Sequence, residues 1–156
     1  MDNLDLLRGR FSLLEFIRLV RQDTRQLQIG RHTLAITKRI DKAVYDFEHG
    51  ISTYLIVTIP FRHGKSEIIS RHFPPFFLGR NPNAEIILST YGQGLSNEMS
   101  RYARNIVKRS TEYHKLFPHI TLSKASSSVQ TWALDGYRGK FQAITISAGG
   151  TGRGAD

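Results

Sequence analysis

Residues 54–73 read YLIVTIPFRHGKSEIISRHF, and this stretch decides the fold. It begins with a short run of β-branched and aromatic residues, which predicts a strand of about Thr53–Ile59 buried on both faces, as in a parallel sheet. A turn containing Gly64-Lys65-Ser66 follows, and then a helical pattern with Ile68, Ile69 and Phe73 on one side. Strand, glycine-containing turn and helix form the context of a phosphate-binding loop.

The residue types in this turn suit phosphate chemistry. Unpaired N–H groups and the dipole make a helix N-terminus positive, and Gly64 lets the backbone approach a phosphate closely. Lys65 would reach the β and γ phosphates, and the Ser66 hydroxyl would hold Mg²⁺. The usual pattern has a glycine where Ile59 stands, so an ordinary helix start with Ser66 as cap and Lys65 in solvent is the alternative. The predicted nucleotide-contacting residues are Pro60, Phe61, Arg62, His63, Gly64, Lys65, Ser66 and Glu67.

Composition sets the class of protein. The chain has 156 residues, 40% of them hydrophobic, which predicts one soluble domain with a real core. It contains no cysteine, so disulfides and thiolate metal sites are excluded. No apolar run approaches the roughly 18 residues that span a bilayer, and the early acids of MDNLDLLRGR do not fit a secretion signal. We therefore expect a cytoplasmic setting with no membrane partner.

The positive charge is concentrated near the C-terminus. Residues 1–100 carry 13 basic and 10 acidic side chains (+3), whereas residues 101–156 carry 9 and 3 (+6), which together give the net charge of +9. A basic stripe on a predicted helix, which we expect to contact nucleic-acid phosphates, consists of Arg101, Arg104, Lys108 and Arg109. The alternative is that these cations form a solvated, solubilising surface.

The remaining patterns predict an α/β fold. Helices are expected over about residues 11–28, with Ser12 and Glu15 as a capping box, over His32–Glu48, and over Gln93–Ser110. The helix expected after the loop should end or kink at Phe73, before Pro74-Pro75. A second buried strand is expected at Ala84–Thr90, and a loop at residues 111–128. Val129–Asp135 and Lys140–Ser147 are expected to form a hairpin, either at the edge of the sheet or as an appended ribbon.

A nucleotide hydrolase also needs an apolar strand that ends in a carboxylate to hold Mg²⁺. No run of four apolar residues followed by Asp or Glu occurs after Lys65, because Asp135 follows a half-polar strand and Asp156 follows a glycine-rich segment. That segment has four glycines in its last nine residues and includes Arg153, so it is either a phosphate-contacting loop or a tail.

Several motifs together resemble a known family. PFRHGKS at 60–66, FPPFFLGRNP at 73–82, ILSTYGQGLSNEMSRYARNIV at 87–107, YHKLFP at 113–118 and GTGRGAD at 150–156 occur in one order. In combination they resemble the ATPase domain of the large terminase subunit of tailed bacteriophages, over roughly residues 30–156. Residues 1–29 would then be an N-terminal helical segment ahead of an incomplete ATPase domain.

The resemblance implies a RecA-like P-loop fold and a motor that uses ATP and Mg²⁺ to drive double-stranded DNA into a procapsid. It implies partners, namely the portal protein, the small terminase subunit and other copies of the chain in a ring, in the host bacterial cytoplasm at the procapsid portal. The family's loop commonly lacks the leading glycine, so Ile59 fits. Lys65 and Arg62 would be catalytic, with Arg62 or Arg153 stabilising γ-phosphate charge, and His32 would lie on the adenine side.

The resemblance also predicts where the site is incomplete. In the family, a motif like GTGRGAD precedes the acidic Mg²⁺-binding strand, and a nuclease domain follows later. We therefore expect a fragment that binds nucleotide weakly and hydrolyses it poorly or not at all. The other hypotheses are a non-catalytic nucleic-acid-binding module with a vestigial phosphate loop, and another P-loop ATPase of helicase or kinase type.

Overall fold

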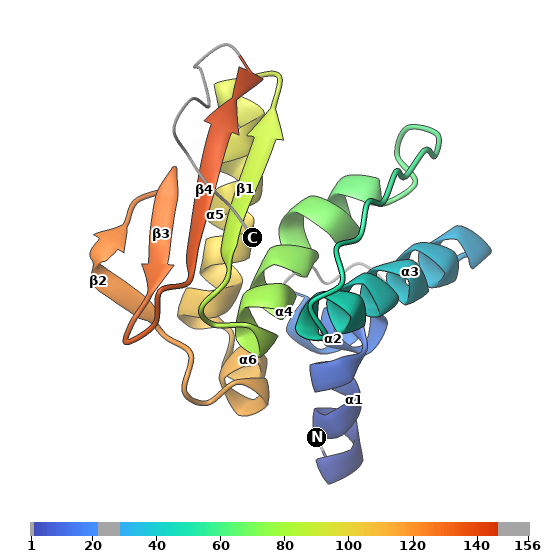
Figure 1. Cartoon of the computed structure of the whole chain (residues 1–156), viewed down its shortest axis with the longest axis horizontal. Helices are drawn as coiled ribbons and strands as arrows, with labels where there is room; N and C mark the ends of the chain where they lie inside the picture. The colour runs from blue at the N-terminus through green and yellow to red at the C-terminus, as the bar shows by residue number, and fades with distance from the viewer. Residues whose placement is uncertain (1, 22–28, 147–156) are drawn as a thin grey trace.

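The computed structural model describes residues 2–21 and 29–146. The elements in chain order are α1 (Asn3–Phe11), α2 (Leu13–Val20), α3 (Arg31–Glu48), the π-helix η1 (Glu67–His72), α4 (Phe73–Arg80), β1 (Glu85–Thr90), α5 (Gln93–Arg109), α6 (Thr111–Leu116), β2 (Leu122–Ser127), β3 (Thr131–Leu134) and β4 (Lys140–Thr145). The strands form a four-stranded sheet, and helices α1 to α4 lie beside it (Figure 1). The predicted α/β class is confirmed.

The sheet is mixed, with the order β1-β4-β3-β2. β1 and β4 are parallel, from Glu85 opposite Lys140 to Thr90 opposite Thr145, whereas β3 is antiparallel to both β4 and β2. Parallel strands were expected at Thr53–Ile59 and Ala84–Thr90, but the parallel pair in the structure is β1 with β4, a strand that the sequence assigned to the hairpin. The prediction that the hairpin lies at the edge of the sheet or forms an appended ribbon is wrong for β4, which lies between β1 and β3 and whose consecutive residues Phe141 and Gln142 are both buried.

Helix α5 anchors the hairpin and joins the sheet to the helices. Trp132 on β3 stacks on Phe141 with ring centroids 5.0 Å apart, and its Nε1 donates to the Ser100 hydroxyl on α5 at 3.1 Å. α5 packs against β1 and β4, and it also contacts η1 and α4. The predicted helix and the predicted strand are thus confirmed as α5 and β1, but β1 is not the buried strand expected at Ala84–Thr90, because it has one neighbour in the sheet and its residues Glu85–Thr90 stay partly exposed. α5 connects the sheet with the helix that follows the loop.

The segment predicted as the first strand, Thr53–Ile59, is not a strand. It runs extended away from the sheet (Figure 1), and none of the four sheet strands pairs with it. Its side chains divide into two sets, because Tyr54 and Ile56 are 95% and 92% exposed while Val57 and Ile59 pack partly against the core. A strand needs a neighbour to bond its backbone, and the described residues place none beside this segment.

The helix expected over residues 11–28 corresponds to α2, which begins at Leu13, and residues 22–28 lie outside the described ranges. The sequence did not predict α1, which ends at Phe11. The predicted capping box of Ser12 and Glu15 is wrong, because the Ser12 side chain makes no cap hydrogen bond. Instead the Leu13 N–H donates to the carboxylate of Asp41 on α3 at 2.8 Å. The capping box of this region belongs to α1, where the Asp2 and Asp5 carboxylates accept from each other's N–H groups.

The helix predicted over His32–Glu48 is confirmed as α3, and its buried stripe includes Thr37, Ile40 and Val44. Leu34 and Phe47 were expected in this stripe, but both are exposed, at 40% and 37%. Leu34 lies to the side of the stripe, whereas Phe47 lies in line with it near the end of the helix, where it packs on Phe77 and lines a pocket. The predicted stripe of α2 is confirmed for Leu13, Ile17 and Val20. α2 and α3 share one core with the sheet, with Phe76 of α4, and with α5.

The helix after the loop does not end at Phe73. It changes there from π-type to α-type and continues as α4, with Pro74 and Pro75 in the first turn, where their missing N–H groups cost little. The predicted loop over residues 111–128 is also wrong, since it contains α6 and β2. The Ser110 hydroxyl caps α6 by accepting from the Tyr113 N–H at 3.1 Å. Within residues 2–21 and 29–146, no helix combines the length and apolarity needed to cross a bilayer.

Candidate nucleotide-binding site

The turn between the extended segment and η1 has a distinct backbone conformation. Arg62 and Gly64 both have positive φ angles, of 62° and 81°, and Arg62 is the non-glycine residue with this property in the described chain. An added Cβ at Gly64 would meet no atom within 4 Å, so the backbone angle rather than crowding favours glycine there. Alternation of this kind turns successive N–H groups to one side of the chain, which is a common design for anion binding.

A helix begins immediately after Gly64. Lys65 and Ser66 are helical, and the first helical hydrogen bond runs from the Ile68 N–H to the Gly64 carbonyl at 3.0 Å. The N–H groups of Lys65, Ser66 and Glu67 therefore precede that bond, as the first amides of a helix do. With the dipole of the helix behind them, these amides make a positive end that faces the turn.

The turn encloses a cavity of about 550 Å³. The residues that line it are Ile59, Pro60, Phe61, Arg62, His63, Gly64, Lys65, Ser66, Glu67 and Arg71. The eight residues predicted to contact nucleotide, Pro60 to Glu67, thus surround one space. Lys65 and Arg62 are exposed, whereas Glu67 turns its carboxylate into a group of ion pairs behind the loop. Contact of these residues with nucleotide stays a prediction.

A second helix starts beside the loop. The ring of His32, in the first turn of α3, lies against the ring of His63 with centroids 5.6 Å apart in an edge-to-face arrangement. Gly30 precedes α3, and a Cβ there would come within 2.6 Å of the His32 ring, so the absence of a side chain makes room for it. His32 and the loop therefore lie side by side in the structure. The resemblance predicts that both contact the same nucleotide.

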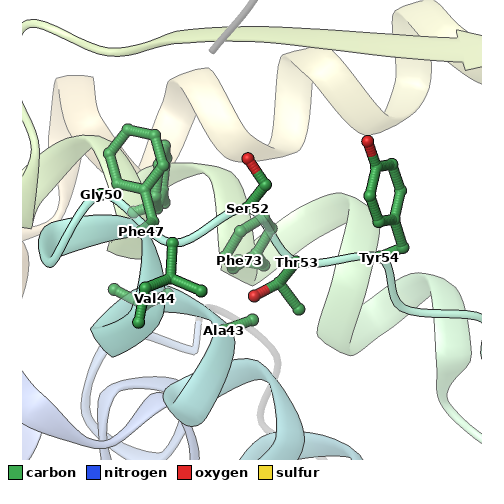
Figure 2. Close-up of a pocket in the computed structure, with 10 residues that line it drawn as sticks. Ala43, Val44, Phe47, Gly50, Ser52, Thr53, Tyr54 and Phe73 are labelled. Atoms are coloured by element: carbon green, nitrogen blue, oxygen red, sulfur yellow. The ribbon is translucent and has the colours of Figure 1, made fainter.

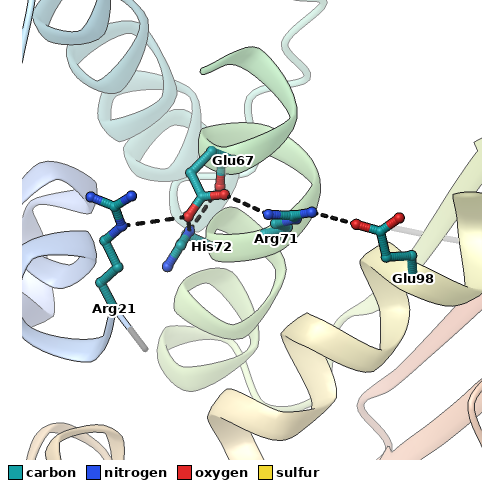
Figure 3. A network of polar contacts seen from close by, with 5 residues as sticks. All are labelled: Arg21, Glu67, Arg71, His72 and Glu98. Atoms are coloured by element: carbon teal, nitrogen blue, oxygen red, sulfur yellow. Dashed lines mark hydrogen bonds and ion pairs between the residues drawn. The ribbon is translucent and has the colours of Figure 1, made fainter. Parts of the chain in front are cut away.

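A polar network lies directly behind the loop (Figure 3). The carboxylate of Glu67 accepts from Arg71 Nη1 at 2.9 Å and lies 3.8 Å from Arg21 Nε, at the end of α2. Arg71 Nη2 reaches across to Glu98 on α5. His72 Nδ1 lies 2.8 Å from the Glu67 carbonyl oxygen, a distance at which it donates to that oxygen. The network thus joins η1 to both α2 and α5.

Burial controls the protonation of this network. Burial lowers the pKa of His72, and the nearby Arg21 and Arg71 lower it further against the opposing effect of Glu67. The ring is fully buried, and its Nε2 has no hydrogen-bond partner in the structure. Burial also lowers the pKa of Arg71, but the bonds from Glu67 and Glu98 outweigh it and the net direction is upward. A neutral His72 between charged pairs follows from these effects.

A larger pocket, of about 610 Å³, lies where the chain leaves α3 (Figure 2). It is lined mainly by apolar side chains, among them Val44, Phe47 and Phe73, and by the start of the extended segment at Ser52–Tyr54. The Thr53 hydroxyl is 3.5 Å from the Asp46 carboxylate, which makes at most a weak bond. Size alone would favour this pocket as the ligand-binding site. The backbone N–H groups and cationic side chains that suit a phosphate, however, lie around the smaller cavity at the loop.

The predicted nucleic-acid-binding residues lie apart from the loop, on α5. Arg101, Lys108 and Arg109 are exposed, while Arg104 donates from Nη1 to the Ser127 carbonyl on β2 at 2.6 Å. Arg104 is thus already bonded within the fold. Arg153, the other predicted phosphate contact, lies outside the described residues.

A magnesium ion fits this site only in part. The Ser66 hydroxyl lines the cavity next to the helix amides, which is the position from which such a group would hold a phosphate-bound Mg²⁺. Across the described ranges, no three His, Asp or Glu side chains gather closely enough to hold a metal ion. Ser66 would therefore share the metal with phosphate oxygens.

Sequence reasoning missed three members of the site, Arg71, His72 and Glu98. The pair Glu67 and Arg71 had a detectable signal, because opposite charges four residues apart lie on one face of a helix. Glu98 had none, since its position depends on the packing of α5 against η1. Comparison with known proteins adds no relative, as no family model, curated protein or solved structure matches this chain.

Proposed function

We propose that this chain is the nucleotide-binding part of an ATP-driven DNA-packaging motor, of the type formed by the large terminase subunit of tailed bacteriophages, with a RecA-like P-loop domain. The observation that carries the proposal is the loop itself. Two positive φ angles, a glycine at Gly64 and an immediate helix start place amides, Lys65 and Ser66 around one cavity. The order of the five motifs along the chain supports the motor type.

In this proposal each loop residue has a physical role. The amides of Lys65, Ser66 and Glu67 bind phosphate oxygens, and the Lys65 ammonium neutralises β and γ charge. Arg62, exposed and held at positive φ, projects toward the γ-phosphate and stabilises the charge that develops there. His32 and His63 flank the loop on the side of the base. Bound Mg²⁺ would supply charge neutralisation at the phosphates beside Ser66.

The carboxylates that complete such a site are not provided by a cluster of acids in the described residues. The proposal includes weak nucleotide binding and poor hydrolysis by this chain alone. Double-stranded DNA, the portal protein, the small terminase subunit and further copies of the chain in a ring are the partners that the proposal includes, in the host cytoplasm at the procapsid portal.

Binding of the non-hydrolysable analogue AMP-PNP, measured by calorimetry with Mg²⁺, tests the proposal. Lys65→Ala should reduce the affinity at least about tenfold, because it removes a charge beside the bound phosphates. Lys115→Ala is the matched control, since Lys115 is an exposed lysine on α6. Equal affinity of the Lys65→Ala variant and the unmodified protein would refute the proposal.

A nucleic-acid-binding module is the second candidate, and the exposed cations of α5 favour it. In that case Arg101→Ala and Lys108→Ala weaken duplex DNA binding while Lys65→Ala does not. The affinity should fall by about 0.9 log units per log unit of salt for each DNA phosphate that the protein neutralises. A flat salt dependence would leave α5 as a solvated surface.

A further inference from the structure

The cavity of the loop contains a cation that lies outside the phosphate-loop pattern. Arg71, one helical turn after Glu67, lines the cavity together with Lys65. Its Nη1 donates to Glu67 at 2.9 Å and its Nη2 to Glu98. Because each terminal nitrogen of a guanidinium carries two N–H groups, these two bonds leave a further donor on each nitrogen.

The surroundings of Arg71 fix its position and cancel its charge. The ring of Tyr102 lies under the guanidinium, 5.0 Å from its central carbon to the ring centroid. Two carboxylates, from Glu67 and Glu98, bind this one guanidinium. A ligand in the cavity would therefore meet an oriented donor group whose charge is already neutralised.

The two carboxylates differ in how firmly they are held. The Glu67 side chain is mostly buried, and it is also close to Arg21 at 3.8 Å and to His72 Nδ1 at 3.6 Å. The Glu98 side chain is 57% exposed, and its ion pair is the one with Arg71. Glu98 can therefore exchange Arg71 for water at low cost, whereas Glu67 cannot.

We propose that Arg71 is a latent phosphate-binding residue of the loop cavity and that Glu98 sets its strength by competing for it. A polyphosphate bound in the loop takes the Nη2 donors of Arg71, and Glu98 turns to solvent. Since Glu98 belongs to α5 and Arg71 to η1, occupancy of the loop releases an ion pair between these two helices. This inference rests on the proposed nucleotide binding, and it identifies Glu98 as the group that competes with phosphate for Arg71.

The test is the affinity for AMP-PNP, with Mg²⁺ at fixed ionic strength, of the Glu98→Gln variant. Removing this carboxylate frees the charge of Arg71, so the affinity should rise about three- to tenfold. Glu48→Gln is the matched control, because Glu48 pairs with Arg80 at 2.6 Å and its loss changes the net charge equally. The control should bind as the unmodified protein does. A purely structural role of Glu98 predicts unchanged or weaker binding.

The double variant Arg71→Gln/Glu98→Gln tests whether Arg71 causes the rise in affinity of Glu98→Gln. Without Arg71, the affinity for AMP-PNP should not rise. Arg71→Met/Glu98→Gln replaces it if the glutamine variant does not fold, because methionine keeps an unbranched side chain and carries no charge. A gain that persists without Arg71, or Glu98→Gln binding no tighter than Glu48→Gln, overturns the inference while nucleotide binding stands. If the unmodified protein binds neither AMP-PNP nor inorganic pyrophosphate, the proposed function and this inference both fail.

Discussion

The exposure of Ile56 distinguishes the observed fold from the one predicted from the sequence, in which this residue lies in a buried strand. Its side chain is 92% exposed on the extended segment ahead of the loop. Substitution of a side chain that is already in water changes the free energy of unfolding by within about 0.5 kcal/mol. We therefore expect Ile56→Asn to be nearly neutral. In a strand buried on both faces, the same change would place an amide in the core and cost about 3 kcal/mol or more.

Urea unfolding followed by tryptophan fluorescence gives this measurement, because Trp132 is fully buried in the core. Ile68→Ala is the internal comparison, since Ile68 is 2% exposed on η1 and its truncation should cost about 2–5 kcal/mol. Two isoleucines on either side of the loop thus report opposite environments. A loss above about 2 kcal/mol for Ile56→Asn would show that this segment is buried and that the argument is wrong.

Two further predictions concern the helices that hold the loop. Because the pKa of His72 is lowered in the folded protein, the unfolded chain binds a proton more readily, and stability should fall as the pH drops below about 6.5. His72→Gln should make the free energy of unfolding depend less on pH, measured by urea unfolding from pH 7.5 to 5.5. An unchanged pH dependence in this variant would contradict the prediction. Asp41→Ala should cost about 1 kcal/mol in the same assay, because the Leu13 N–H loses its cap, and a loss under about 0.3 kcal/mol would exclude this role.

The sequence was sufficient to predict those helices and strands whose apolar pattern lies within the element itself. The helix from His32 and the strand from Ala84 were predicted close to their observed bounds, because the helix has a clear apolar period and the strand is a short apolar run. The hairpin of Trp132 and Phe141 followed in the same way from alternation around a glycine turn. The loop residues Pro60 to Glu67 line one cavity because they are adjacent in sequence, and their contact with nucleotide stays a prediction.

Several of the failures depend on partners far away in the chain. Whether Thr53–Ile59 becomes a strand depends on a neighbour rather than on its β-branched residues. The cap of α2 comes from Asp41, which is 28 positions after Leu13. The same is true of the site, where Glu98 reaches Arg71 from another helix. Residues 111–128 are the exception, because Ser110 followed by Glu112 was a readable helix start.

The continuous helix from the loop into α4 limits where the loop can bend. Lys65 to Arg80 are helical without interruption, and the far half of this helix is fixed in the core by Phe76 and Leu78. Lys65 therefore cannot swing without moving that anchored helix. Any opening of the site must come from the other side, where Arg62 and Gly64 have left-handed backbone angles. Movement of the loop is therefore expected at Arg62–Gly64, while the helix that follows stays in place.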